Sequence, residues 1–321
     1  MLDPTHVLRA AAGRQFERQV RRSDRPIGLV LMYHEVAWEP GDPAREVFPA
    51  LGAGLFRDQL RHLQRHYEVV SLAQLAERAA QRSPGDPLPV ALTFDDDYSR
   101  HATVAAPILG ELGFTATFFL CGNSLRGPAP FWWQDLQVIL NRGDDAWPKL
   151  RAELARDWPW ATLEAEVRDL TNTIEAAPQK IHDAIVARLR ELAGPQLLDE
   201  GLSAEAVRGL AGAGFEIGFH TRRHYRLETL DGRALDRALT EGLDDLADVL
   251  GRSPTTIAYP HAKAELRVAA AAQRAGFEHG YLLGDIPTTP AQHPLLRSRV
   301  GGQTASLAAF QWVLGRAGSR G

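Results

Sequence analysis

The chain carries three acidic residues in a row and, much further on, two histidines spaced four apart. The acidic residues Asp95, Asp96 and Asp97 directly follow the apolar run Val90–Phe94. Adjacent carboxylates at the end of a buried strand repel one another and are costly to desolvate, so a bound cation would relieve them. The alternative is that one of these aspartates only caps the next helix.

The two histidines, His220 and His224, also follow an apolar run, Phe215–Phe219. At this spacing both rings lie on one face if the segment turns helical, and both can then reach one metal ion. Two imidazoles and one carboxylate make a three-ligand site with open positions for water and substrate. The sequence therefore predicts one divalent metal ion, with zinc preferred and cobalt, nickel and manganese as alternatives.

Short apolar runs alternate with helical patterns along the chain. The runs are nearly continuous in hydrophobicity, which is typical of parallel strands covered by helices on both faces. This alternation predicts an α/β fold, as either a barrel or an open sheet. In a barrel the carboxyl ends of the strands form one rim, where four segments with reactive side chains would converge. The runs are Ile27–Tyr33, Val90–Phe94, Ala116–Leu120, Phe215–Phe219, Thr256–Tyr259 and His279–Leu283.

The middle of the chain, about residues 125–200, breaks this rhythm. It holds no clear strand, and five of the seven tryptophans lie between Trp132 and Trp160. We expect a mainly helical insertion in a single domain that spans residues 1–321. The tryptophans form either a sugar-stacking surface or, as we prefer given the area that each buries, the core of the insertion.

The N-terminal segment predicts a basic amphipathic helix at about residues 5–22. Residues 6–25 carry six arginines, and apolar residues recur every four positions. Such a helix packs on the domain or, alternatively, makes peripheral contact with an anionic membrane surface. We find neither a secretory signal nor an apolar run long enough to span a bilayer, and expect a cytoplasmic protein, with membrane association as the alternative.

Composition narrows the classes of partner and ligand. The net charge is −4, from 36 basic and 40 acidic residues, which gives no reason to expect a nucleic-acid partner. Cys121 is the only cysteine, so neither a disulfide framework nor a thiolate zinc site can form. A metal site in this chain must therefore use nitrogen and oxygen ligands.

Several motifs resemble those of the polysaccharide deacetylases (carbohydrate esterase family 4, the NodB-homology domain). The string LTFDDDYS resembles their TFDDG motif, and IGFHTRRH resembles their H-(S/T)-x-x-H motif. IAYPH is similar to the FAYPYG variant of their third motif. VLMYHEV, YEVVSLAQL and GFTATFFL resemble the exopolysaccharide-associated branch. The resemblance spans about residues 27–300, with the insertion matching less well.

The resemblance implies a distorted, TIM-like (β/α) barrel of about seven strands that hydrolyses an N-acyl group. By the motifs, Asp95 would be the general base, and Asp96, His220 and His224 the metal ligands. The backbone N–H near His261 would help to form an oxyanion hole.

The general acid has two candidates. Some relatives use a histidine from a C-terminal Leu-x-His motif, which has no clear counterpart here; His293 is a late candidate in different surroundings. In the exopolysaccharide branch the histidine of the M-Y-H motif takes this role, so we prefer His34. Four residues beside the motifs are expected to contact the sugar: Tyr33, Tyr259, Pro260 and His261. The alternative for the two tyrosines is that they only brace the strands.

Three positions depart from the family pattern. Asp97 replaces the glycine of TFDDG; if that position has a positive φ, aspartate adopts it at modest cost, and its charge would perturb the base. The third motif lacks the arginine that orients the catalytic aspartate in many relatives, and Arg297 or Arg299 from a later strand are candidates to replace it. Ala262 stands where the motif has glycine.

The leading hypothesis is a metal-dependent N-deacetylase acting on an N-acetylhexosamine in a glycan or glycan precursor. One alternative is a deformylase or other amidase acting on a lipid- or nucleotide-linked sugar. A third hypothesis is a catalytically inactive barrel that binds glycans. Loss of metal ligands would favour that third hypothesis, and none of the motif ligands is lost.

Overall fold

A computed structural model describes residues 12–13, 15–16, 18–20, 22–162 and 166–320. Much of the helix predicted at about residues 5–22 therefore lies outside the described residues. Where this segment is described, it packs on the last helix, α13 (Leu307–Ser319): the ring centroids of Phe16 and Trp312 are 5.7 Å apart. No helix in the described part of the chain is both long and apolar enough to cross a membrane.

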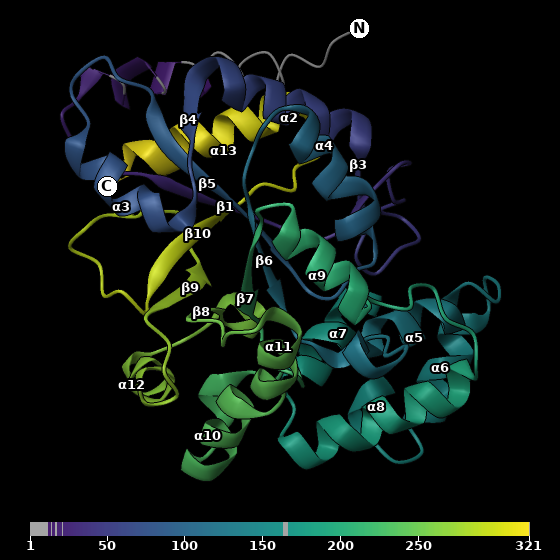
Figure 1. Ribbon diagram of the computed structural model, residues 1–321. Helices are drawn as coiled ribbons and strands as arrows, with labels where there is room; N and C mark the ends of the chain where they lie inside the picture. Colours follow the sequence, from purple (N-terminus) through teal and green to yellow (C-terminus); the bar gives the residue numbers. More distant parts are fainter. Residues whose placement is uncertain (1–11, 14, 17, 21, 163–165, 321) are drawn as a thin grey trace, which may run out of the picture.

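Seven parallel strands close into a barrel, which confirms the predicted fold class (Figure 1). Closure occurs because β1 pairs with β5 on one side and with β10 on the other. A further strand, β4 (Tyr67–Val69), extends the sheet beyond β5, and β2 (Val36–Ala37) pairs with β3 (Leu51–Gly52) outside it. The barrel strands are β1 (Leu29–Tyr33), β5 (Leu88–Asp95), β6 (Thr117–Leu120), β7 (Glu216–Phe219), β8 (Thr256–Ala258), β9 (His279–Leu283) and β10 (Arg297–Gly301).

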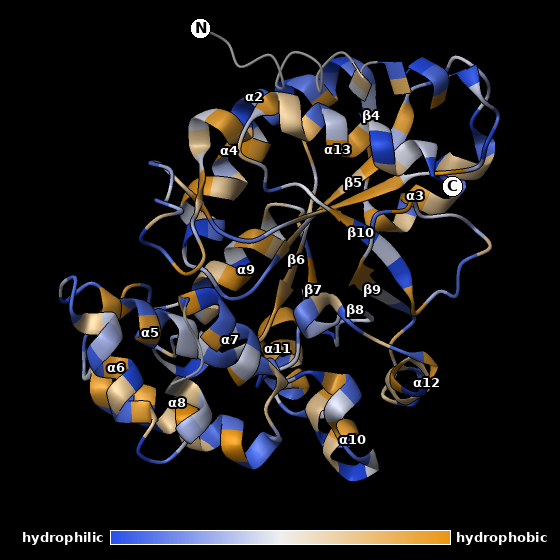
Figure 2. Ribbon diagram, turned by 180° about the vertical axis from the view of Figure 1, so that it is seen from behind, coloured by the Kyte–Doolittle hydropathy of each residue, from blue (hydrophilic) through white to orange (hydrophobic). Residues whose placement is uncertain are grey.

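Most of the strands are apolar because helices cover them from outside while side chains fill the barrel. All eight residues of β5 are buried, so its carboxyl end delivers the acidic triplet from a rigid element. Figure 2 shows hydrophobic strands at the centre and hydrophilic residues on the outer helices. The surrounding helices are α2 (Ala53–His66), α3 (Leu72–Gln81), α4 (Ala106–Glu111), α9 (Ala204–Gly212), α10 (Gly232–Thr240), α11 (Leu243–Leu250), α12 (Leu266–Arg274) and α13.

The segment between β6 and α9 is helical and has a hydrophobic core of its own. It contains α5 (Trp132–Leu140), α6 (Ala146–Leu154), α7 (Val167–Ala176) and α8 (Gln179–Ala193). All five tryptophans of this segment contribute to that core or pack against it. The segment lies beside the barrel, with α7 on the side that faces it (Figure 1).

Candidate active site

A cavity of about 700 Å³ lies at the carboxyl ends of the strands. The four segments expected to converge all reach this cavity. The ends of β1, β5, β7 and β8 contribute His34, Asp95, His220 and His261 to its wall, in that order. They meet because a parallel barrel places the carboxyl ends of all its strands at one rim.

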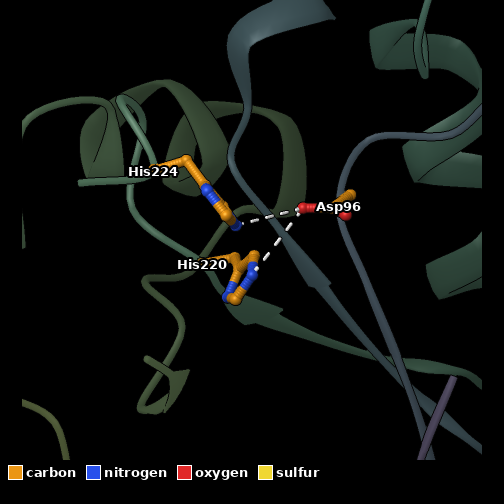
Figure 3. A group of neighbouring side chains, drawn as sticks. All are labelled: Asp96, His220 and His224. Atoms are coloured by element: carbon orange, nitrogen blue, oxygen red, sulfur yellow. Dashed lines mark ion pairs between the residues drawn. The ribbon is translucent and has the colours of Figure 1, made fainter. Parts of the chain in front are cut away.

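Three of the cavity residues form a group that could hold a metal ion (Figure 3). Asp96 Oδ1 lies 3.7 Å from His220 Nε2 and 3.6 Å from His224 Nε2. Donors bound tetrahedrally to zinc at normal lengths lie about 3.4 Å apart, so the spacing fits a single ion with little adjustment. Asp96 Oδ1 is buried and has no hydrogen-bond partner among the described residues, a costly state that a cation would remove.

The two imidazoles are in the state that a metal requires. His220 Nδ1 donates to the carbonyl oxygen of Ala258 at 2.8 Å, so the lone pair of Nε2 faces Asp96. Burial lowers the pKa of His220 to about 4, although the charge of Asp95 opposes that shift. Burial and the neighbouring histidines also lower the pKa of His224. Both rings are therefore neutral at pH 7 and able to coordinate.

The segment that carries the two histidines is not helical, so the condition considered for it from sequence is not met. The segment after β7 forms a turn, in which Thr221 has φ 58° and His224 has φ 50°. Left-handed backbone at two non-glycine residues is unfavourable and is typical of functional sites. The turn brings the two ring centroids to 5.0 Å, the proximity that a helix was expected to supply.

The third aspartate does not have the backbone conformation considered for it. Asp96 has the positive φ, 75°, and Asp97 has none. The Asp97 carboxylate accepts the backbone N–H groups of Cys121, Gly122 and Asn123, at 2.8, 3.1 and 2.8 Å. Asp97 therefore fixes the loop after β6. Burial raises the pKa of Asp96, and the charges of Asp95 and then Asp97 raise it further.

A buried arginine holds Asp95. Arg299 on β10 donates from its two terminal nitrogens to the two carboxylate oxygens of Asp95, at 2.6 and 2.7 Å. Burial alone would raise the pKa of Asp95, but the charge and hydrogen bonds of Arg299, together with the charges of the neighbouring histidines, outweigh burial and lower that pKa to about 2. Of the two arginines considered from sequence, Arg299 therefore takes the place of the missing motif arginine.

The structure separates the two candidates for the general acid. His34 lines the cavity, and its backbone N–H donates to Gln303 Oε1 at 3.2 Å. Burial lowers the pKa of His34, while the charge of Asp95 raises it. His293 is exposed, is not part of the cavity wall, and accepts the backbone N–H of Leu295 at 3.1 Å. Of the two candidates, only His34 lines the cavity.

Of the four residues expected to contact the sugar, only His261 lines the cavity. Tyr33 and Tyr259 are fully buried. Their hydroxyls donate to Gln59 Oε1 at 3.1 Å and to the carbonyl oxygen of Leu295 at 2.9 Å. Pro260 is buried as well. The prediction that these three contact substrate is corrected: the tyrosines brace the barrel, which was the alternative.

The insertion supplies a wall of the cavity that the sequence did not predict. Trp133, Asn172 and Glu175 all line it. The indole N–H of Trp133 donates to the Tyr98 hydroxyl at 3.2 Å, and its ring lies edge-on to His224 at 5.1 Å. The tryptophan-rich stretch was the signal for Trp133, but Asn172 and Glu175 follow no recognisable pattern.

The fold and the site define a barrel hydrolase with a paired carboxylate and two neutral histidines at the rim. The family model for polysaccharide deacetylases matches residues 82–154 and 163–280, more than half of the chain. The chain belongs to the polysaccharide deacetylase family and is a carbohydrate N-deacetylase. No curated protein matches it significantly.

Solved structures of deacetylases share the fold at low sequence identity. The deacetylase PplD of Streptococcus pyogenes, in complex with acetate, has a TM-score of 0.59 and 16% identity, over 91% of this chain and 98% of that one. IcaB from Ammonifex degensii has a TM-score of 0.57 and 17% identity, over 91% and 97%. The BpsB deacetylase domain from Bordetella bronchiseptica has a TM-score of 0.52 and 14% identity, over 87% and 96%.

Proposed function

We propose that this protein removes an N-acetyl group from an N-acetylhexosamine of a glycan or glycan precursor, using one divalent metal ion held by Asp96, His220 and His224. The observation that carries the proposal is the buried, unpartnered Oδ1 of Asp96 facing two neutral imidazoles. Zinc is the preferred ion because it accepts mixed nitrogen and oxygen ligands in three-ligand catalytic sites.

Asp95 is the proposed general base. When bound, the ion would lower the pKa of a coordinated water towards 7 and polarise the acyl carbonyl. Asp95 Oδ2 lies 3.9 Å from His220 Nε2, so the base faces the same space as the ligands. Its low pKa keeps Asp95 ionised, and Arg299 fixes the plane of the carboxylate while it accepts the proton of the attacking water.

Two further groups complete the chemistry. The backbone N–H of His261 has no backbone acceptor in the described ranges, and His261 lines the cavity. This N–H would therefore donate to the developing oxyanion. His34 would deliver a proton to the departing amine, which is a poor leaving group unless it is protonated. Together these groups account for attack, charge stabilisation and departure.

The test of this function is an activity assay on protein loaded separately with zinc, cobalt, nickel or manganese. The substrates are N-acetylhexosamine oligosaccharides and the corresponding N-formyl sugars, and the readout is loss of the acyl group by mass spectrometry. We expect deacetylation with at least one metal and none after chelation. Metal-loaded protein that releases acetate from no substrate would refute the proposal, and preferential release of formate would favour the deformylase alternative.

Replacing His34 by glutamine is expected to lower kcat by about 10²-fold while metal content stays unchanged, since general-acid catalysis contributes this much. His293→Gln is the matched control, because that ring is exposed and outside the cavity, and its kcat should stay within about twofold of wild type. Loss of metal in the His34 variant would instead make His34 a ligand.

Replacing Arg299 by glutamine is expected to lower both stability and turnover. Asp95 would then be buried without its cation, and breaking such a pair costs about 3–5 kcal/mol. Arg299→Lys keeps the charge but not the two-pronged hydrogen bonding, so its stability should be intermediate and its kcat still reduced. Thermal unfolding and kcat/KM measure both effects. Wild-type kcat/KM in the lysine variant would show that Arg299 neutralises Asp95 without orienting it.

A further inference from the structure

The loop after β8, residues 259–263, holds two consecutive non-glycine residues in left-handed conformation. His261 has φ 55° and Ala262 has φ 57°. A side chain with a Cβ atom disfavours this region, and such residues persist only where neighbouring contacts hold them. We call this segment the His261 loop. Its conformation decides where the backbone N–H of His261 points.

Each ring nitrogen of His261 lies within hydrogen-bond distance of an oxygen that can accept. Nε2 lies 3.0 Å from the carbonyl oxygen of His224, and Nδ1 lies 3.2 Å from Glu175 Oε2. The two side chains are largely buried, with His261 10% and Glu175 20% exposed. The imidazole therefore joins the His261 loop to the metal-ligand turn and to the helical insertion.

The position of Glu175 follows from how α7 packs. Ile174, the preceding residue, is fully buried in the core of the insertion. Asn172 precedes Glu175 by one helical turn, so both lie on one face, and both line the cavity. Helix α7 is thus anchored in the insertion by one face, while Asn172 and Glu175 on the other face line the cavity.

We propose that Glu175 is a positioning residue, through which the insertion holds the His261 loop in its catalytic conformation. The proposal rests on the proposed function, because the N–H of His261 is the oxyanion donor invoked there. A donor that acts on the oxyanion stabilises the transition state more than the bound substrate. Loss of Glu175 should therefore reduce kcat far more than it changes KM.

The first test is a double-mutant cycle. We expect Glu175→Ala to lower kcat by about tenfold or more, less than the 10²–10³ lost on deleting an oxyanion donor, with KM and metal content close to wild type. His261→Ala should give a similar loss. The double variant should lose no more than the larger single loss, because each single variant already removes the contact between Glu175 and His261. Glu175→Gln should recover part of the activity, since its amide oxygen accepts from Nδ1–H.

Asp169→Asn is the matched control, because Asp169 is an exposed carboxylate on the same helix. Its kcat should stay within about twofold of wild type. A Glu175→Ala variant with wild-type kcat, or losses that add in the double variant, would overturn the proposal. If Glu175→Ala does not fold, the near-isosteric Glu175→Gln is measured instead. Its kcat should be lower than that of wild type, and a wild-type kcat would overturn the proposal.

The second test needs no substrate, and so separates this proposal from the proposed function. Hydrogen–deuterium exchange of a peptide covering residues 259–263 should be faster in Glu175→Ala than in wild type and in Asp169→Asn. Unchanged exchange would overturn the positioning role whatever the activity. Faster exchange in a metal-loaded protein that deacetylates nothing would retain the role of Glu175 in holding the loop and reject only the proposed reaction.

Discussion

Replacing Asp95 by asparagine is expected to lower kcat by about 10³-fold while the protein keeps its metal. The amide preserves the shape of the side chain but cannot accept the proton of the attacking water, and general-base catalysis contributes about 10²–10⁴-fold. Asp95 is not in the predicted ligand set, so metal content by elemental analysis should equal that of wild type. Steady-state kinetics on the best N-acetylated substrate measures the loss.

Asp97→Asn is the control for that experiment because it alters the same acidic triplet. The Asp97 carboxylate serves three backbone N–H groups of the loop after β6 and does not face the ligands. Its replacement should lower the melting temperature, since charge-assisted hydrogen bonds are lost, and reduce kcat less than tenfold. Substantial turnover in Asp95→Asn would remove Asp95 as the base and leave Arg299 pairing as its main role.

The double variant His220→Ala/His224→Ala is expected to lose both the bound metal and all measurable turnover. Two of the three proposed ligands disappear, and a lone carboxylate binds divalent ions weakly in water. Wild type should hold about one divalent ion per chain after incubation with zinc and removal of the excess. Elemental analysis of both proteins measures the difference.

Replacing Arg222 and Arg223, which lie between the two histidines in sequence, is the control for the double variant. Both arginines point away to acidic partners, Asp245 and Glu241, so their alanine variants should keep the metal. An unchanged metal content in the double histidine variant would place the ion elsewhere. Absence of metal from wild type under every loading condition would contradict the proposed mechanism.

Much of the candidate site could be predicted because its residues directly follow apolar strands. In a barrel the carboxyl ends of the strands meet at one rim, so Asp95, Asp96 and His220 could be placed at that rim from local pattern alone. His34 follows the same logic. His224 lies beside His220 as expected, but a left-handed turn rather than a helix brings it there.

The partners of these residues could not be predicted in the same way. Arg299 contacts Asp95 although 204 positions separate them in the sequence. Nothing in the sequence around Arg299 distinguishes it from any other charged residue on a strand. Tyr33 and Tyr259 show the converse error, because sequence position beside a motif does not say which way a side chain points. In a strand, neighbouring side chains alternate between two faces.

The sequence by itself determined the α/β class, the acidic and histidine motifs, and hence the reaction type that the family match confirms. Tertiary structure alone decided that β1 joins β5 to β10, that Arg299 pairs with Asp95, and that Glu175 reaches the His261 loop. The physical reason is that hydrophobic runs and turn residues act locally, whereas charge pairing depends on which distant segments packing brings within about 3 Å of each other.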